Sequence, residues 1–465
     1  MNRIWLVLGL FVFGMLSCQK TGFITDQSAI LDTTTDSLRF DTVFTSTGSI
    51  TQFFKIYNRN DQKLRISSIN LMGGNSSPYK INVDGDAGTQ FSNIEMEAND
   101  SIYVFVSVTI NPTAANAPFI AQDSIKINFN GKTKWVQLEA FGQNANYIRS
   151  LALSGNNTWT NSKPYVILGG MQILPNASLT IQQGTKVYVH ADAPIIVDGT
   201  LITQGGPEAA NRVVFKGDRL DQPYADFPAS WPGIYFRSTS KNNVLQYTSI
   251  LNAYQALVTE NGVANSNPTL TLESCIVDNA YDAGIIALNS SIKASNSLIS
   301  NCGKNIQLAL GGIYSFTNCT NVAYSNSYIL HKEPGLFVSN SYKQNNAVIV
   351  SPLYAQFTNC IFWGAFGTVD NEVVTSKDNS AVFDASFINC SWKVKSAPAN
   401  ATVNNMVTID DPQFDSINTS KRYFDFHLKE TSPLINKGAS VGLLKDLDGK
   451  NRSVAQPDLG CYERQ

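Results

Sequence analysis

Two short stretches of the 465-residue chain place acidic residues close together. The candidates are Asp218, Arg219, Asp221 and Asp226 in "GDRLDQPYADFP", and Asp278 and Asp282 in "DNAYDAG". Cleavage of a glycosidic bond needs two carboxylates beside the bond, or a cationic base with acidic calcium ligands. These residues are therefore catalytic candidates for a polysaccharide lyase or a glycoside hydrolase. The alternative is that they only form turns, because Gly, Asn and Pro stand beside them.

Four aromatic residues are candidates for binding a glycan by stacking on its sugar rings. They are Trp231, Tyr235, Trp363 and Trp392. Large aromatic side chains also dominate the packing of protein cores, which is the competing interpretation. We expect the core role for most of them, and ligand binding stays the alternative.

Three near copies of one string end in Asn-Cys: "SFTNC" at 315–319, "QFTNC" at 356–360 and "SFINC" at 386–390. The related pairs, whose second members follow at intervals of 22, 22, 22, 19 and 30 residues, are Ser274-Cys275, Asn296-Ser297, Asn318-Cys319, Asn340-Ser341, Asn359-Cys360 and Asn389-Cys390. A period near 22 residues predicts one coil of a parallel β-helix for each copy. A position that accepts Ser as readily as Cys does not select for a thiolate, so we expect inert, buried thiols.

This register also limits which cysteines can form a disulfide. It places Cys275 and Cys319 two coils apart, and likewise Cys319 and Cys360. Two strand spacings of ~4.8 Å exceed the ~7 Å Cα separation that a disulfide allows. Cys360 and Cys390 lie on adjacent coils and are the pair left open.

Residues that could bind a metal ion are few. His190, His331 and His427 do not fall at the spacing of zinc ligands. Asp446 and Asp448 in "DLDGKNR" are candidate calcium ligands, although Asp-Gly is also a common tight turn. We expect no other cofactor.

The elements that position these residues are predicted to be β-strands throughout. Asn, Ser, Thr and Gly abound, and short alternating runs end at Gly, Asn, Asp or Pro. Runs such as "SIYVFVSVTI" predict a β-sandwich over residues 38–145. Short strands with Gly or Asn corners predict a β-helix over 146–405, with 406–465 closing it.

The first 37 residues are interpreted as a targeting leader and a tether. Arg3 precedes an apolar run that is too short for the ~20 residues of a membrane-spanning helix. Leu16-Ser17-Cys18 follows it and resembles a bacterial lipobox, which implies cleavage after residue 17 and acylation of Cys18. The polar stretch 18–37 would then be the tether.

The order of the later phrases resembles known envelope proteins. The run from "FDTVFTSTGS" to "LEAFGQNA" resembles the immunoglobulin-like domain at the front of Gram-negative β-helix lipoproteins. "LTIQQGTKVYV", "IIVDGTLITQGG" and "SWPGIYF" resemble the opening coils of right-handed parallel β-helix proteins with the pectate-lyase-like fold. The end resembles the closing segment of choice-of-anchor Q domains, through Asp411, Pro412, Phe414, Ser432, Pro433, Ile435, Gly438, Asp446, Asp448, Gly449, Arg452, Asp458, Leu459, Gly460, Tyr462 and Glu463. This resemblance implies a segment that packs on the final coil.

Composition narrows the function further. The chain has 15% charged residues and a net charge of −2, so it has no basic field to hold nucleic acid. We expect an outer-membrane lipoprotein, held by membrane lipid through Cys18, with a non-catalytic structural, adhesion or glycan-binding role. The alternative is a polysaccharide lyase or glycoside hydrolase that acts on a face of the β-helix.

Overall fold

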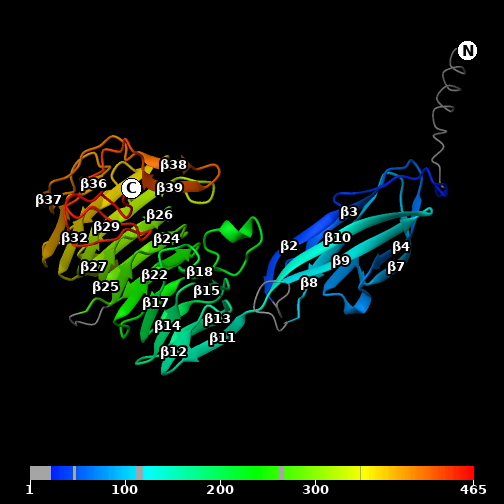
Figure 1. Cartoon of the computed structure of the whole chain (residues 1–465), viewed down its shortest axis with the longest axis horizontal. Helices are drawn as coiled ribbons and strands as arrows, with labels where there is room; N and C mark the ends of the chain where they lie inside the picture. Colours follow the sequence, from blue (N-terminus) through cyan, green and yellow to red (C-terminus); the bar gives the residue numbers. More distant parts are fainter. Residues whose placement is uncertain (1–21, 45–48, 112–118, 261–266, 346) are drawn as a thin grey trace, which may run out of the picture. The chain divides into compact units, whose positions relative to one another are not determined.

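The computed structural model describes residues 22–44, 49–111, 119–260, 267–345 and 347–465. The chain is all β, as predicted, and its two compact units divide between Asn144 and Ala145 (Figure 1). The helical turns among the described residues are η1 (Gly74–Ser76) and η2 (Tyr224–Asp226). Within these ranges no helix is long and apolar enough to cross a membrane. Cys18 and the leader lie outside the described residues.

The first unit is a β-sandwich of two five-stranded sheets. One sheet contains, in spatial order, β1 (Leu31–Thr33), β3 (Gln52–Asn58), β8 (Ser101–Val108), β5 (Tyr79–Val83) and β6 (Asp86–Gly88). The other contains β2 (Ser37–Phe44), β10 (Lys132–Gln143), β9 (Phe119–Phe129), β4 (Leu64–Leu71) and β7 (Gln90–Met96). In β8 every second side chain from Ile102 to Val108 is buried, which is the period that gives a strand one core-facing side.

The second unit is a parallel β-helix whose 25 strands stack in three rows, here called rows A, B and C. Row A contains β12 (Asn156–Trp159), β14 (Ser178–Gln182), β17 (Thr200–Gln204), β20 (Asn243–Gln246), β23 (Leu270–Glu273), the second halves of β25 (Ala283–Ser295) and β27 (Lys304–Thr317), β32 (Leu353–Thr358), β35 (Phe383–Ile388) and β37 (Ala401–Asn404). Row B contains β15 (Lys186–Val189), β18 (Val213–Gly217), β21 (Thr248–Leu251), β24 (Ile276–Asp278), β26 (Leu298–Ser300), β28 (Thr320–Tyr324), β33 (Ile361–Ala365) and β36 (Ser391–Trp392). Row C contains β16 (Ile195–Val197), β19 (Ile234–Phe236), β22 (Gln255–Glu260), the first halves of β25 and β27, β29 (Leu336–Ser339) and β34 (Val373–Ser376). The first strands, β11 (Asn146–Leu153) and β13 (Tyr165–Ile173), each run through rows B and C.

Asparagine forms the corners between the rows. The corner from row A to row B has positive φ at Tyr247, Ser274, Asn296, Asn318, Asn359 and Asn389. Asn tolerates this left-handed conformation better than most residues, and Asn359 Nδ2 also donates to Asn318 Oδ1 at 3.1 Å on the adjacent coil. A second set at the corner from row B to row C, Asn252, Asn279 and Asn301, was not predicted. The two sets mark the turns of the coils in which they occur.

One predicted rung is wrong. Asn340-Ser341 does not lie at the corner from row A to row B, because Ser341 starts a hairpin of β30 (Ser341–Gln344) and β31 (Ala347–Val350). Thr320 pairs directly with Ile361, so Cys319 and Cys360 lie on adjacent coils rather than two coils apart. The hairpin and the loop 325–335 lengthen a single coil, and a chance Asn-Ser pair inside the insertion imitated the repeat.

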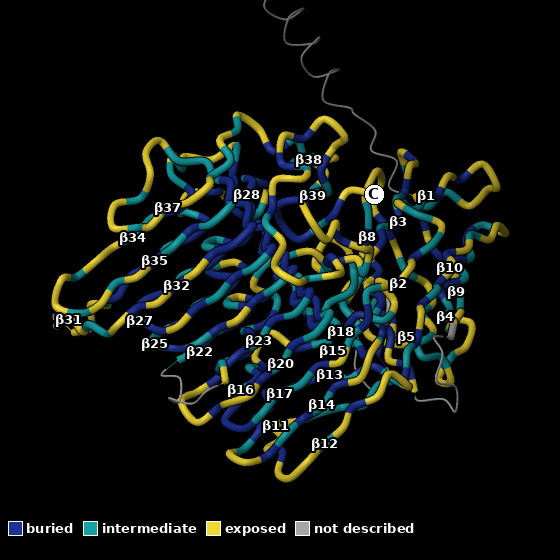
Figure 2. The backbone as a smooth tube through the Cα atoms, turned by 60° about the vertical axis from the view of Figure 1, so that its left-hand side comes forward, coloured by how far each residue is buried: buried dark blue, intermediate teal, exposed yellow. Residues whose placement is uncertain are grey.

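Two apolar clusters hold the β-helix together. The interior cluster includes stacked rings of Phe316, Phe357 and Phe387, with centroids 5.4 and 4.8 Å apart. The outer cluster forms where the C-terminal segment, with its hairpin of β38 (Phe414–Asn418) and β39 (Tyr423–Leu428), packs on the outer face of row B. Figure 2 shows buried backbone along the stacked strands and exposed residues at the projecting loops.

The C-terminal segment lies along several coils rather than on the final coil alone. It contacts the asparagine corners one after another: Asn296 Nδ2 donates to Lys445 O, Asn318 Nδ2 to Gly460 O and Asn359 Nδ2 to Ala439 O. Arg452 is buried and donates to Asn296 Oδ1 and Glu463 Oε2. The asparagine side chains at the corners therefore hold the C-terminal segment by hydrogen bonds to its backbone carbonyl groups.

Candidate functional site

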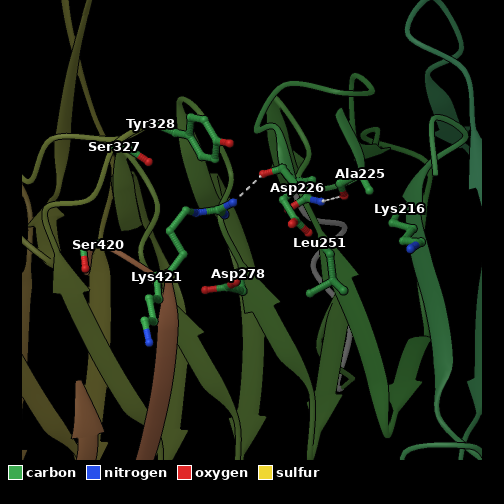
Figure 3. Close-up of a pocket in the computed structure, with 11 residues that line it drawn as sticks. Lys216, Ala225, Asp226, Leu251, Asp278, Ser327, Tyr328, Ser420 and Lys421 are labelled. Carbon is green, nitrogen blue, oxygen red and sulfur yellow. Dashed lines mark hydrogen bonds between the residues drawn. The ribbon is translucent and has the colours of Figure 1, made fainter. Parts of the chain in front are cut away.

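A pocket of ≈ 410 Å³ opens on the outer face of row B, beside the turn that joins β38 and β39 of the C-terminal segment. Its lining residues are Lys216, Ala225, Asp226, Leu251, Asn252, Asp278, Ser327, Tyr328, Ser420, Lys421 and Arg422. In Figure 3, Lys216 lies at one end and Ser420 and Lys421 at the other, with Asp278 and Leu251 between them. Most of these side chains are polar, so the pocket suits a hydrophilic ligand.

Three consecutive strands of row B form the floor. Leu251 pairs with Asp278, and Asp278 pairs with Ser300 on the next strand. Lys216 follows Phe215, which pairs with Ile250, so Lys216 stands beside Leu251. Lys216 and Asp278 are therefore two strand spacings apart, about 10 Å. The alternation of the strand turns all these side chains outward, since Phe215 and Ile250 belong to the interior cluster.

The loop between β18 and β19 forms one wall, and the second set of asparagine corners holds it in place. Asn252 Nδ2 donates to Ala225 O at 2.9 Å, and Asn279 Nδ2 donates to Asp226 O at 3.0 Å. Asn279 Nδ2 also donates to Asn252 Oδ1 at 2.8 Å, which ties the two corners together. These bonds fix η2, and with it Asp226, against the coil.

The opposite wall joins two further insertions. Tyr328, in the loop after β28, packs edge-on against Phe227 with centroids 4.9 Å apart. The Arg422 guanidinium, at the tip of the β38–β39 hairpin, lies 4.4 Å from the Tyr328 ring centre and donates from Nη1 to Asp226 O at 3.0 Å. Three insertions from distant parts of the chain therefore meet around this pocket.

The ionisable groups on the floor are shifted by burial. Asp278 Oδ1 accepts from Ser300 Oγ at 2.7 Å and Asn301 Nδ2 at 3.3 Å, yet desolvation outweighs these bonds and raises the pKa of Asp278. Burial likewise lowers the pKa of Lys216, while Asp226 acts in the opposite sense. Both charges are held at an electrostatic cost, which is characteristic of functional sites.

The structure separates the predicted catalytic residues. Asp278 lines the pocket, but Asp218 bonds His190 Nδ1 at 2.7 Å. Arg219 and Asp221 form a two-bond ion pair with each other, at 2.7 and 2.8 Å. Asp282 pairs with a lysine, Lys304 Nζ, at 2.9 Å, and it also accepts from Gln255. Thus the two acids of "DNAYDAG" have different surroundings, because they flank the corner from row B to row C: Asp278 lines the pocket, and Asp282 forms an ion pair.

The four aromatic candidates mostly pack within the protein. Trp231 is 1% exposed and donates from Nε1 to Leu251 O at 2.8 Å, and Trp363 is 8% exposed within the outer cluster. Trp392 packs against Phe387, with ring centroids 5.0 Å apart, and Tyr235 donates to Pro232 O at 3.1 Å. None of the four lines the pocket.

The calcium and disulfide candidates have structural roles. Asp446 accepts three backbone N–H groups, from Asp448, Lys450 and Glu463, and Asp448 Oδ2 bonds His427 Nε2 at 2.9 Å. In the described part of the chain, no group of three or more His, Cys, Asp or Glu residues could hold a metal ion.

The sequence left the Cys360–Cys390 pair open as a disulfide, and the structure has no bond between them. Both thiols are free and buried, and Cys360 N donates to Cys390 Sγ at 3.3 Å. Burial raises the pKa of the Cys360 thiol well above its ordinary value, so this group stays protonated and unreactive.

Sequence reasoning missed most of the pocket. Lys216, Tyr328 and Arg422 were not singled out, although Asp226 and Asp278 were. One usable signal is the lysine in "RVVFKGD", a charge in an otherwise apolar strand. Tyr328 and Arg422 give no such signal, because ordinary loops and turns carry these residue types.

Comparisons with known proteins leave the function open. No family model and no curated protein matches the chain. Among solved structures it is similar to a family 123 glycoside hydrolase from Clostridium perfringens, at 12% identity and a TM-score of 0.18 over 25% of this chain and 26% of that one. It is also similar to a PapD-like domain of human CEP192, at 9% identity and a TM-score of 0.17 over 24% of this chain and 84% of that domain.

A third structure, a protein of unknown function from Porphyromonas gingivalis, matches at 10% identity and a TM-score of 0.18, over 27% of this chain and 60% of that one. The chain thus spans about a quarter of the hydrolase, and likenesses of this size carry no argument. The class that the fold itself defines is an all-β protein, a β-sandwich followed by a parallel β-helix.

Proposed function

We propose that this protein is a lipid-anchored envelope protein that binds a glycan, without cleaving it, in the pocket on row B. The observation that carries the proposal is the pocket itself, which has a volume of ≈ 410 Å³ and is lined by hydroxyl, carboxylate and cationic groups and by the partly buried ring of Tyr328. Sugars offer many hydroxyl groups, and the hydroxyl, carboxylate and cationic side chains of this lining can form hydrogen bonds with them. The volume is within the range of small-ligand sites.

The anchor rests on the leader. Leu16-Ser17-Cys18 follows an apolar run, and acylation of Cys18 would hold the protein at the outer membrane through lipid. Replacing Cys18 with Ala should move the protein from the membrane fraction to the soluble fraction and abolish incorporation of labelled palmitate. Palmitate incorporation by the Ala variant would refute the anchor, whatever the ligand of the pocket.

Glycan binding is tested by filling the pocket. Ser327 is exposed and lines it, so Ser327→Trp should block ligand entry without burying a polar group. The matched control is Ser238→Trp, at an exposed residue that does not line the pocket. On a glycan array the wild type and the control should bind one common set of glycans, and Ser327→Trp should lose it. No binding by the wild type, or equal binding by Ser327→Trp, would overturn the proposal.

Cleavage is the second candidate, and one observation favours it. Two carboxyl groups, Asp226 and Asp278, line one pocket, and the raised pKa of Asp278 suits a general acid. The other predicted acids have partners outside the pocket: Asp218 is hydrogen-bonded to His190, and Asp221 and Asp282 form ion pairs, which is why we place binding first. Release of reducing ends or unsaturated products from bound glycans, lost in Asp278→Asn, would establish catalysis instead.

A further inference from the structure

The cations of the pocket differ from many others on the β-helix in having no carboxylate partner. Arg219, Arg237, Lys304 and Lys395 each form an ion pair, with Asp221, Asp198, Asp282 and Asp370 respectively. Lys216, Lys421 and Arg422 form none among the described residues. All three line the same pocket.

Lys216 is the most telling of the three. It is partly buried on the floor, and its Nζ lies over the Tyr188 ring, 5.8 Å from the ring centre. Burying an ammonium without an ion-pair partner costs free energy, and a bound anion would offset this cost. Asp226 acts on Lys216 through space, without a hydrogen bond.

Arg422 is also incompletely satisfied. Its Nη1 donates to the Asp226 carbonyl and its plane covers Tyr328, but Nε is buried with no hydrogen-bond partner. Lys421, the neighbouring residue, is exposed at the pocket end opposite Lys216 (Figure 3). The unmatched positive charge thus lies at both ends of the pocket.

The acids do not cancel this charge. Three cations face two carboxyl groups, Asp226 and Asp278. Asp278 is already bonded by Ser300 and Asn301, and desolvation raises its pKa and favours the neutral acid. Asp278 thus receives its hydrogen bonds from two neutral side chains and not from a cation of the pocket.

We infer that the glycan bound here carries negatively charged substituents, carboxylate or sulfate, that Lys216 and the Lys421–Arg422 tip contact from the two ends of the pocket. This inference rests on the proposed function and narrows it to acidic sugar chains. Lys216 then sets specificity, because a neutral sugar would leave its ammonium unpaired.

The experiment compares matched ligands by isothermal titration calorimetry with the whole soluble chain from residue 19 onward. The probes are tetragalacturonate, the same tetrasaccharide after carboxyl reduction, a sulfated galactan oligosaccharide and its desulfated form. At least one acidic probe should bind at least about tenfold more tightly than its neutral counterpart, and its affinity should fall as salt increases. Tight binding of tetragalacturonate would identify the anionic group as carboxylate, and tight binding of the sulfated galactan oligosaccharide would identify it as sulfate.

Variants assign the effect to the pocket. Lys216→Met should weaken the acidic probe at least about tenfold and leave the neutral probe unchanged, whereas Lys395→Met, at a paired and exposed lysine, should change neither. If Lys216→Met fails to fold, Lys421→Ala, at an exposed hairpin residue, tests the same point, because it should also weaken the acidic probe and leave the neutral probe unchanged.

The two proposals fail in different ways. Equal affinity for acidic and neutral probes, both lost in Ser327→Trp, would overturn the acidic inference and keep glycan binding. Acidic binding that survives both lysine variants would also overturn the inference. Failure of every probe and of the glycan array would overturn both proposals.

Discussion

The outer face of row B carries one column of side chains, Lys216, Leu251, Asp278, Ser300, Val322 and Trp363, whose two halves differ. In the later half, Val322 and Trp363 pack under the C-terminal segment with Leu447 and Cys461. In the earlier half, Lys216 and Asp278 line an open pocket.

The backbone of the two halves is the same, so the side chains decide which is covered. Covering apolar groups gains about 25 cal/mol per Å², whereas covering an unpaired charge costs free energy. The C-terminal segment therefore packs apolar side chains on the later half, and at the earlier half only its hairpin tip, with Lys421 and Arg422, borders the pocket. The comparison teaches that a repetitive scaffold creates a site by changing the chemistry along one column.

The largest effect is expected from the ion pair that fastens the cover. Arg452 and Glu463 are 4% and 5% exposed and joined at 3.0 Å, so Arg452→Met would leave the buried Glu463 carboxylate without a cationic partner, with only backbone N–H donors. We expect a loss of about 3–5 kcal/mol in the free energy of unfolding, measured by urea denaturation. Arg452→Met with Glu463→Gln should recover part of this loss. An unchanged midpoint in the single variant would mean that the segment is not fastened here.

The next effect compares one leucine from each half. Leu447 is fully buried in the outer cluster, so Leu447→Ala should cost about 2–5 kcal/mol. Leu251 is only partly buried on the pocket floor, so Leu251→Ala should cost less than about 1 kcal/mol. Equal losses in thermal or urea unfolding would contradict the distinction between a covered and an open half.

A smaller effect of opposite sign is expected at Asp278. Its raised pKa means that the folded state binds the proton more tightly than the unfolded state, so ionisation destabilises the fold at neutral pH. Asp278→Asn should therefore raise the melting temperature at pH 7. The gain should shrink as pH falls through the raised pKa and vanish below the unfolded value near ~3.9. A variant less stable than wild type at pH 7 would refute this.

The smallest effect on stability is expected at His427 on β39. The β38–β39 hairpin packs in the outer cluster, and its tip lines the pocket. Asp448 and Asp425 bond the two ring nitrogens of His427, at 2.9 and 2.6 Å, and raise its pKa, Asp448 most. The stabilisation is full below ~6.5 and is lost as pH rises through the raised folded value.

The stabilisation from the His427–Asp448 pair is also lost at low pH. His427 lowers the pKa of Asp448, whose contribution is present above ~3.9 and lost as pH falls through its lowered folded value. His427→Gln should remove the high-pH decline in melting temperature, and Lys395→Met should not. A decline of the same size in His427→Gln would assign it to other groups.

Much of the β-helix could be predicted because its signals are local. Asn318, Asn359 and Asn389 stand at corners with positive φ, and Cys follows each of them into the interior. These properties depend on a residue and its neighbours, so a repeat near 22 residues reveals them. The prediction failed at Asn340-Ser341, where an insertion offered the same two letters without the corner.

The pocket could be predicted only in part. Asp226 and Asp278 were singled out as acids in turns, but the same reasoning selected Asp218, which is hydrogen-bonded to His190, and Asp282, which forms an ion pair. Nothing in the local sequence distinguishes these cases. The difference lies in what stands beside each carboxylate on the neighbouring coil.

The sequence by itself determined an all-β chain, its division into a sandwich and a β-helix, and the asparagine corners, because strand period and corner conformation are local properties. Only the tertiary structure decided that Lys216, Asp278, Tyr328 and Arg422 share one pocket. Their proximity depends on coil register and on three insertions that meet over row B. The β30–β31 hairpin lengthens one coil and changes that register, and the sequence spacing of the Asn-Cys and Asn-Ser pairs does not reveal it.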